Sequence, residues 1–204
     1  QPVRRTAYDF NADRKADLGI FRPSNQPYGL WYAPYTGGGG VFQIYFGQPG
    51  DVPAVGDYDG DGRADAVIFR PATGLWYGPA TANGRIVIQE LLGQQGDIPL
   101  PCDYDADGKA DPGYYRPSTG RFFVRLSGGG TINTHLGGTP QSGDRPFAGD
   151  FNGDGRCEVG IVRPFAGPFG TSLWYAPYTG GGGALHIYFG ADGDLPVVAD
   201  YNGD

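Results

Sequence analysis

The stretch that decides the fold is DYDGDGRAD, residues 57–65. Four aspartates occupy its first, third, fifth and ninth positions, and a glycine stands at the sixth. Like charges placed this close repel one another, and the segment has too few apolar side chains to form a core. The composition therefore predicts a loop between two strands, and its charge calls for a cation.

The same pattern recurs along the chain. Related stretches are DFNADRKAD (9–17), DYDADGKAD (103–111), DFNGDGRCE (150–158) and the start of a fifth, DYNGD (200–204). Their first aspartates are 48, 46, 47 and 50 residues apart, which is a spacing typical of repeat architectures. The predicted units cover residues 3–50, 51–96, 97–143 and 144–193, with a partial unit at 194–204.

Each unit contains four apolar segments of strand length. In the second unit they are VPAVGDY (52–58), ADAVIFRP (64–71), GLWYGP (74–79) and RIVIQELLG (85–93). Four strands in about 47 residues is the size of one β-propeller blade. The sequence therefore predicts an all-β protein, a single β-propeller domain over residues 1–204 with four full blades and the first strand of a fifth.

Ring closure is left open by the repeat. Both LPVVADY (195–201) and VRRTAYD (3–9) occupy a first-strand position. Either a four-blade ring displaces one terminal strand, or further blades exist in a longer protein, or the spare strand self-associates with another chain. Because the sequence stops inside a fifth motif, we expect it to be a piece of something longer.

Composition narrows the class of protein. Aromatic residues make up 14% of the chain, and 38 glycines and 18 prolines recur at fixed places, which favours many short strands over disorder. The net charge of −7 is concentrated in the acidic loops, and no basic stripe exists to bind nucleic acid. No apolar run reaches the ~18 residues of a membrane-spanning helix.

A hard cation with oxygen ligands would resolve the charge of the loops. Calcium accepts roughly six to eight oxygens in flexible geometry. Positions 1, 3, 5 and 9 would supply side-chain oxygens, and position 7 its backbone carbonyl. The candidate ligands are Asp57, Asp59, Asp61, Arg63 and Asp65; Asp103, Asp105, Asp107, Lys109 and Asp111; Asp150, Asn152, Asp154, Arg156 and Glu158; and Asp9, Asn11, Asp13, Lys15 and Asp17.

The loops differ in quality. The second and third have all four carboxylates, whereas the first has Asn11 and places Arg14 where the others have glycine. An EF-hand would require a glutamate at its twelfth position, which here is Ile68, so this loop is of another kind. The alternative for every copy is an ordinary Asp/Gly turn without metal.

The segment FGQPGDVPAVGDYDGDGRADAVIFRP (46–71) resembles the FG-GAP or VCBS-type repeat of integrin-like β-propellers, and weaker echoes cover essentially the whole chain. The resemblance implies calcium in the loop between the first and second strands of a blade. It also implies an extracellular adhesion module, a carbohydrate-binding module or an appendage of a larger secreted protein. The missing glycine of the first loop and the incomplete set of blades depart from the family pattern.

Two further sets of residues recur in register. Arginines end the second strand of each unit and aspartates precede the first strand of each later unit: Arg22, Arg70, Arg116 and Arg163; Asp51, Asp97, Asp144 and Asp194. They predict repeated ion pairs, with a ligand-binding ring of arginines as the alternative. The aromatic residues Trp31, Trp76 and Trp174 are either core residues or sugar-stacking surfaces.

The first and fourth units share LWYAPYTGGGG, at 30–40 and 173–183. This segment is either a flexible tip or a contact loop that displays Tyr35 and Tyr178. The two cysteines, Cys102 and Cys157, lie at neighbouring loops, so a disulfide is expected, with two free thiols as the alternative.

The chain contains no recognisable catalytic motif, and most carboxylates are committed to the loops, so we expect no enzyme. The predicted function is a calcium-stabilised, secreted or cell-surface module that binds a glycan or a protein. The alternative is a structural repeat unit of a surface fibre or a non-catalytic appendage of a larger secreted protein.

Overall fold

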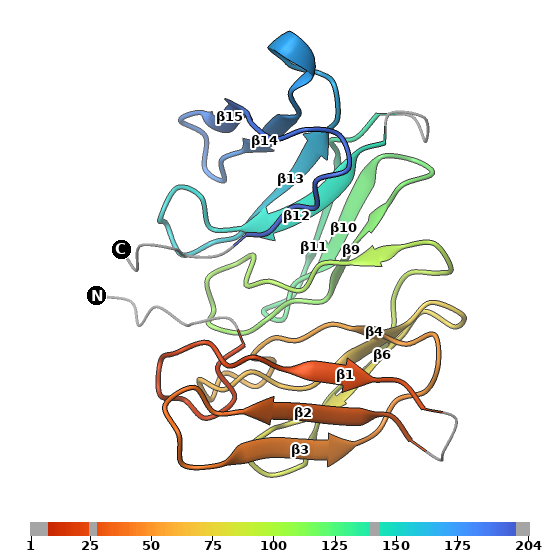
Figure 1. Cartoon of the computed structure of the whole chain (residues 1–204), viewed down its shortest axis with the longest axis vertical. Coiled ribbons are helices and arrows are strands. Elements are labelled where there is room, and N and C mark those ends of the chain that lie inside the picture. Colours follow the sequence, from red (N-terminus) through yellow and green to blue (C-terminus); the bar gives the residue numbers. More distant parts are fainter. Residues whose placement is uncertain (1–7, 25–27, 139–142, 199–204) are drawn as a thin grey trace.

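The computed structural model describes residues 8–24, 28–138 and 143–198. They form four antiparallel sheets that follow one another in chain order as the blades of a four-blade β-propeller (Figure 1). Among these residues the only helical element is η2 (Pro168–Gly170), a single short turn. The predicted all-β propeller is therefore confirmed.

The chain path within each blade is a simple meander, because strands that are consecutive in sequence are neighbours in the sheet. The strands are β1 (Ile20–Arg22), β2 (Leu30–Pro34) and β3 (Val41–Tyr45) in the first blade; β4 (Val52–Pro53), β5 (Ile68–Arg70), β6 (Leu75–Pro79) and β7 (Ile86–Leu91) in the second; β8 (Ile98–Pro99), β9 (Gly113–Arg116), β10 (Arg121–Arg125) and β11 (Thr131–His135) in the third; and β12 (Arg145–Gly149), β13 (Glu158–Arg163), β14 (Leu173–Pro177) and β15 (Ala184–Tyr188) in the fourth.

The first blade has three described strands where four are predicted. Its predicted first strand lies almost entirely at positions 1–7, which are outside the described residues. The predicted first strand of the fifth unit is described only at 195–198, and these residues adopt no regular strand. Residues 199–204, with the start of the fifth loop, are also outside the described range.

The second blade shows how the apolar runs become strands with two buried faces. In the register of β5 with β6, Ile68 lies opposite Tyr77 and Phe69 opposite Trp76. Since side chains alternate across a strand, Ile68 faces the first blade while Phe69 and Trp76 face the third. Ile68, Phe69 and Trp76 are all fully buried, which explains why the run VIF is apolar without alternation.

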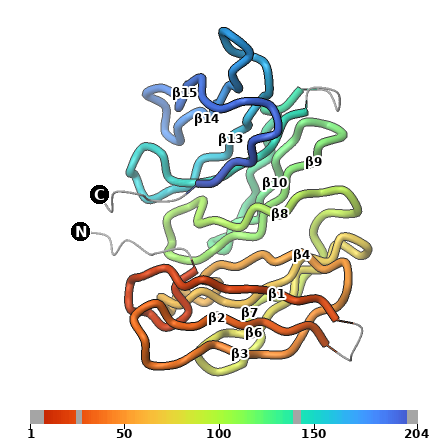
Figure 2. Tube along the Cα trace, in the orientation of Figure 1, coloured from red at the N-terminus to blue at the C-terminus, as the bar shows by residue number. Residues whose placement is uncertain are grey.

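The core consists of apolar clusters between neighbouring sheets. Phe10 and Trp31 of the first blade pack with Ile68 of the second, and the same arrangement joins the second blade to the third and the third to the fourth. Figure 2 follows the trace from the first blade, red at the bottom, to the fourth, blue at the top. Each blade is thus stabilised mainly by its neighbours in sequence.

Three of the predicted ion pairs are confirmed. Arg70, Arg116 and Arg163 each donate through Nε and Nη2 to both carboxylate oxygens of an aspartate, at 2.7–2.9 Å; the partners are Asp51, Asp97 and Asp144. Each pair joins the first strand of a blade to its second. Neither Arg22 nor Asp194 has such a partner within the described ranges.

We expect Arg116→Ala to lower the free energy of unfolding by roughly 2 kcal/mol, because it leaves the buried carboxylate of Asp97 with only the Gln94 amide as a donor. Chemical denaturation measures this loss. Arg121→Ala is the matched control, since Arg121 is exposed and its side chain bonds only to Asn133 among the described residues. An equal loss of unfolding free energy in the two variants would show that the pair of Arg116 with Asp97 contributes no more than an exposed arginine does.

No helix in the described part of the chain is long and apolar enough to cross a membrane.

Candidate metal centres

All four described acidic loops have the same backbone conformation, because their side chains bond to their own amides. The first carboxylate accepts from the amide of the sixth position, at 2.7–2.9 Å in every loop. The fifth-position carboxylate accepts from the amide of the seventh, and the ninth from that of the second. These bonds curl the loop so that its side-chain oxygens converge.

Carboxylate oxygens gather closely in the second and third loops. Those of Asp57, Asp59 and Asp61 lie within 4.8 Å of one another, and the same is true of Asp103, Asp105 and Asp111. In the third loop, Oδ1 of Asp103 is buried and accepts no hydrogen bond of ordinary geometry from a described residue. A buried carboxylate oxygen without a donor is costly, and a cation at this point would compensate it.

Two ninth-position carboxylates, those of Asp65 and Asp111, are the most deeply buried acidic groups among the described residues. Asp65 and Asp111 are fully inaccessible to solvent. Burial raises the pKa of Asp65 to about 7, and the negative charges of Asp59 and Asp57 add to the shift. Burial likewise raises the pKa of Asp111 to about 6, with Asp105 as the nearby charge, and also raises the pKa of Asp103. A bound cation would favour the ionised forms and reverse these shifts.

The first loop keeps the common conformation although it lacks the glycine. Arg14 adopts a left-handed φ of 66° at that position, where Gly62 has a φ of 90°. The absence of glycine therefore does not prevent the loop from closing. Among the described residues, Asp9, Asp13 and Asp17 do not bring three carboxylates into one close group.

In the fourth loop an amide lies between the acidic groups. Nδ2 of Asn152 donates to Asp154 at 3.2 Å and to Glu158 at 3.1 Å. The amide of Arg156 helps to hold the pKa of Asp154 below its ordinary value. This loop satisfies its carboxylates internally, so the second and third loops fit a metal best. Backbone carbonyls at Lys15, Arg63, Lys109 and Arg156 remain predicted ligands.

One set of site residues is not apparent from the motif. The turn between the third and fourth strands of each blade places a hydroxyl residue against the ninth-position carboxylate, and its backbone amide donates at 2.7–3.0 Å. These residues are Thr36, Thr81, Ser127 and Thr179. The sequence does show a Thr or Ser after the third strand of every unit. Its contact with the ninth-position carboxylate becomes evident only when the turn and the loop are seen side by side in the folded blade.

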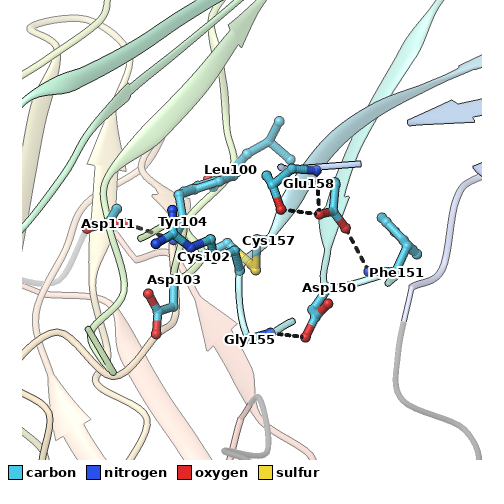
Figure 3. Close-up of a disulfide and its surroundings, with 12 residues drawn as sticks. Leu100, Cys102, Asp103, Tyr104, Asp111, Asp150, Phe151, Gly155, Cys157 and Glu158 are labelled. Atoms are coloured by element: carbon cyan, nitrogen blue, oxygen red, sulfur yellow. Dashed lines mark hydrogen bonds between the residues drawn. A yellow bond between two sulfur atoms is a disulfide. The ribbon is translucent and has the colours of Figure 1, made fainter. Parts of the chain in front are cut away.

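Neighbouring loops are joined directly. The backbone carbonyl of the first position accepts from the eighth-position amide of the next loop: Asp9 from Ala64 at 2.6 Å, Asp57 from Ala110 at 2.6 Å and Asp103 from Cys157 at 2.8 Å. A disulfide joins Cys102 to Cys157, so the third and fourth loops are also linked covalently. Figure 3 shows this bond between the carboxylates of Asp103 and Asp150.

The aromatic candidates are mostly core residues. Trp31 and Trp76 are buried between blades and offer no face to a sugar, so the core interpretation holds and the ligand-binding alternative is wrong for both. Trp174 is half-buried against Phe147. Tyr35 and Tyr178 are also half-buried, and each ring covers the last glycine of its own Gly-rich turn.

Comparisons with known proteins find a similar solved structure but no matching family model and no matching curated protein. No protein-family model matches it, and no curated protein matches it. Among solved structures, it is similar to a protein of unknown function from Bacteroides caccae, with a TM-score of 0.46 and 10% sequence identity. The match covers 91% of this chain, which spans 65% of that protein's length.

Proposed function

We propose that this protein is a calcium-stabilised β-propeller of the FG-GAP or VCBS type that serves outside the cell as a binding module for a glycan or a protein. The observation that carries the calcium role is the third loop. Three carboxylates converge there within 4.8 Å, and one buried oxygen of Asp103 accepts no hydrogen bond of ordinary geometry from the part of the chain that the structure describes. Hard oxygen ligands in a flexible loop suit calcium.

The residues that would hold calcium in the second loop are Asp57, Asp59, Asp61 and Asp65, with the carbonyl of Arg63. Their equivalents in the third loop are Asp103, Asp105, Asp107, Asp111 and Lys109. When bound, the ion supplies the positive charge that these carboxylates lack. Since each loop joins the first strand of a blade to the second, the loaded loop would hold the two strands in register.

The extracellular assignment is supported by the disulfide between Cys102 and Cys157, since such bonds persist mainly in oxidising compartments. A binding role is supported by exposed aromatic side chains on the fourth blade. Phe169, in the η2 turn that projects at the top of Figure 1, is fully exposed, and Phe165 beside it is 64% exposed. Apolar side chains displayed on a loop favour contact with a ligand.

The alternative role, a structural unit within a larger assembly, is favoured by a different observation. The outward faces of the first and fourth blades carry exposed apolar side chains such as Leu18 and Phe189. This role does not require a glycan or a protein ligand, and it is compatible with calcium in the loops.

Calcium titration by calorimetry tests the proposal. At about pH 7.5 we expect about two ions per chain, and loss of one ion in each of Asp57→Asn and Asp103→Asn. Asp192→Asn, a change at an exposed aspartate outside the four described loops, is the matched control. Absence of binding heat in the wild type would refute the calcium role.

Affinity at the second loop should fall as the pH is lowered. The carboxyl of Asp65, with a pKa of about 7 without metal, is mostly protonated at about pH 5.5, and calcium must then displace the proton. Between about pH 7.5 and pH 5.5 this competition should weaken binding at the second loop by about 20-fold. Unchanged affinity over that range would mean that Asp65 does not take part.

A further inference from the structure

The fourth blade has a longer connection between its second and third strands than the two blades before it. Residues 164–172 join β13 to β14, whereas residues 71–74 and 117–120 make the same connection in the second and third blades. The sequence of the longer connection is PFAGPFGTS, in which two short units, PFAG and PFG, follow one another. The extra residues are not needed to close the turn, because a much shorter segment suffices in the neighbouring blades.

Both phenylalanines of this connection point outward from a well-braced backbone. Phe165 and Phe169 have left-handed φ angles of 54° and 57°, which are uncommon for a bulky side chain, and both are exposed. The amide of Gly167 donates to the carbonyl of Thr171 at 2.9 Å, and the amide and hydroxyl of Thr171 both donate to the carbonyl of Pro168. Such backbone outliers cluster at ligand-binding sites, where the surrounding structure maintains them.

Three aromatic rings of β14 and β15 lie in a row beside this connection. Tyr175 is opposite His186 in the register, and their ring centroids are 6.0 Å apart with the planes perpendicular. His186 and Tyr188 are two residues apart on β15, with ring centroids 5.4 Å apart. The ring of Tyr188 packs on the backbone of Gly167 so closely that a side chain there would have no room. The row therefore runs from β14 across β15 to the connection.

This row, together with Phe165 and Phe169, is called the aromatic platform below. The fold does not require it, because the equivalent positions of the other blades do not hold three rings. In the order of Tyr175, His186 and Tyr188, these positions hold Tyr32, Gln43 and Tyr45 in the first blade, Tyr77, Gln89 and Leu91 in the second, and Phe123, Asn133 and His135 in the third.

The aromatic platform combines apolar ring faces with free polar groups and no formal charge. His186 is exposed and Tyr188 is 48% exposed. The hydroxyls of Tyr175 and Tyr188 and the imidazole of His186 form no hydrogen bond with any described residue. The connection and the three rings include no Asp, Glu, Lys or Arg, and Arg163, which precedes the connection, is held by Asp144.

We propose that the aromatic platform binds a neutral glycan chain. A sugar ring has an apolar face that packs on an aromatic ring, and its hydroxyls bond to polar groups such as the tyrosine hydroxyls and the imidazole. Because the rings form an exposed row, an extended chain of several sugar units covers them better than a single sugar does.

Charge distinguishes this ligand from the alternatives. An acidic glycan, or a protein whose recognition depends on charged side chains, finds no complementary charge on the aromatic platform. An uncharged polar chain loses nothing by this absence and gains from every exposed ring that it covers. The inference rests on the binding role proposed above and names the class of ligand and the surface that takes it.

Calorimetric titration of the 204-residue chain at saturating calcium tests the inference. The neutral probes are cellohexaose, mannohexaose and chitohexaose, and hexagalacturonate is their acidic counterpart. We expect at least one neutral probe to bind with a Kd below about 1 mM, and the acidic probe to give no binding heat. Tyr188→Ala and Phe169→Ser should each weaken the binding at least about 10-fold without loss of stability, because both side chains are exposed.

Tyr45→Ala is the matched control. Tyr45 occupies the position of Tyr188 in the first blade and is 59% exposed, but Gln43 rather than a ring lies beside it, and Nε2 of Gln43 donates to its hydroxyl at 2.6 Å. We expect this variant to bind the neutral probe as tightly as the wild type does.

The inference is overturned if no neutral probe binds, and a protein then remains as the ligand of the proposed function. It is also overturned if either platform variant binds as tightly as the wild type, if Tyr45→Ala weakens binding equally, or if hexagalacturonate binds better than the neutral probes. A chain that binds calcium but no sugar contradicts only this inference. A chain that binds sugar through the aromatic platform but no calcium contradicts only the metal role.

Discussion

Removing calcium from the protein is expected to lower its Tm by roughly 10–20 °C relative to a buffer with about 10 mM calcium. A ligand at about 100 times its Kd stabilises the folded state by ~2.7 kcal/mol per site, and the second and third loops offer two sites. The physical reason lies in the buried carboxylates. Without an ion, Asp65 and Asp111 must be held in an environment that disfavours their charge.

The loop variants separate this effect from a general effect of salt. Asp57→Asn and Asp103→Asn should each lose about half of the calcium-dependent stabilisation, because each removes the first ligand of one loop. Asp192→Asn should retain all of it, and magnesium at the same concentration should stabilise less, since it demands stricter geometry. Equal melting of the wild type in calcium and in chelator would rule out a structural ion.

Repetition is what made the fold readable from sequence. The four copies of the acidic loop gave the period, and the apolar runs between them gave the strands, so the blades could be placed without any single strand being certain. The ion pairs followed from the same register, because Arg70 and Asp51 recur at equivalent positions in the next two blades.

Contacts that depend on how elements meet in space could not be read in this way. Thr81 reaches Asp65 from 16 residues away, because the register of β5 with β6, continued beyond the strands, places Thr81 opposite Ala64. The sequence also could not decide whether the tryptophans are core residues or sugar-stacking residues, because a strand of a stacked sheet and a sugar-binding surface are both rich in aromatic residues. Burial of Trp31 and Trp76 between blades resolves it.

The bonds between loops suggest how a change at one site reaches the next. Because the first carbonyl of one loop accepts from the eighth residue of the following loop, each loop braces its neighbour. A metal that orders the second loop would therefore also fix one edge of the third. The disulfide strengthens this connection at one point only, between the third and fourth loops.

Removing that disulfide is expected to lower the free energy of unfolding by ~4 kcal/mol, because the bond closes a long loop in the unfolded chain. The two cysteines are 55 residues apart in sequence. The corresponding fall in Tm is about 8–16 °C. The double variant Cys102→Ala/Cys157→Ala, compared with the wild type by denaturation at saturating calcium, measures the change.

Reductant provides the control for this disulfide, and the second loop provides an internal reference. Adding reductant should bring the wild type to the stability of the double variant and should leave the double variant unchanged. Calcium binding at the third loop should weaken in the double variant, because Cys102 directly precedes Asp103, while binding at the second loop, which carries no cysteine, should change less. If the double variant were as stable as the oxidised wild type, the covalent link would add nothing to what stacking and the bond from Cys157 to Asp103 already provide.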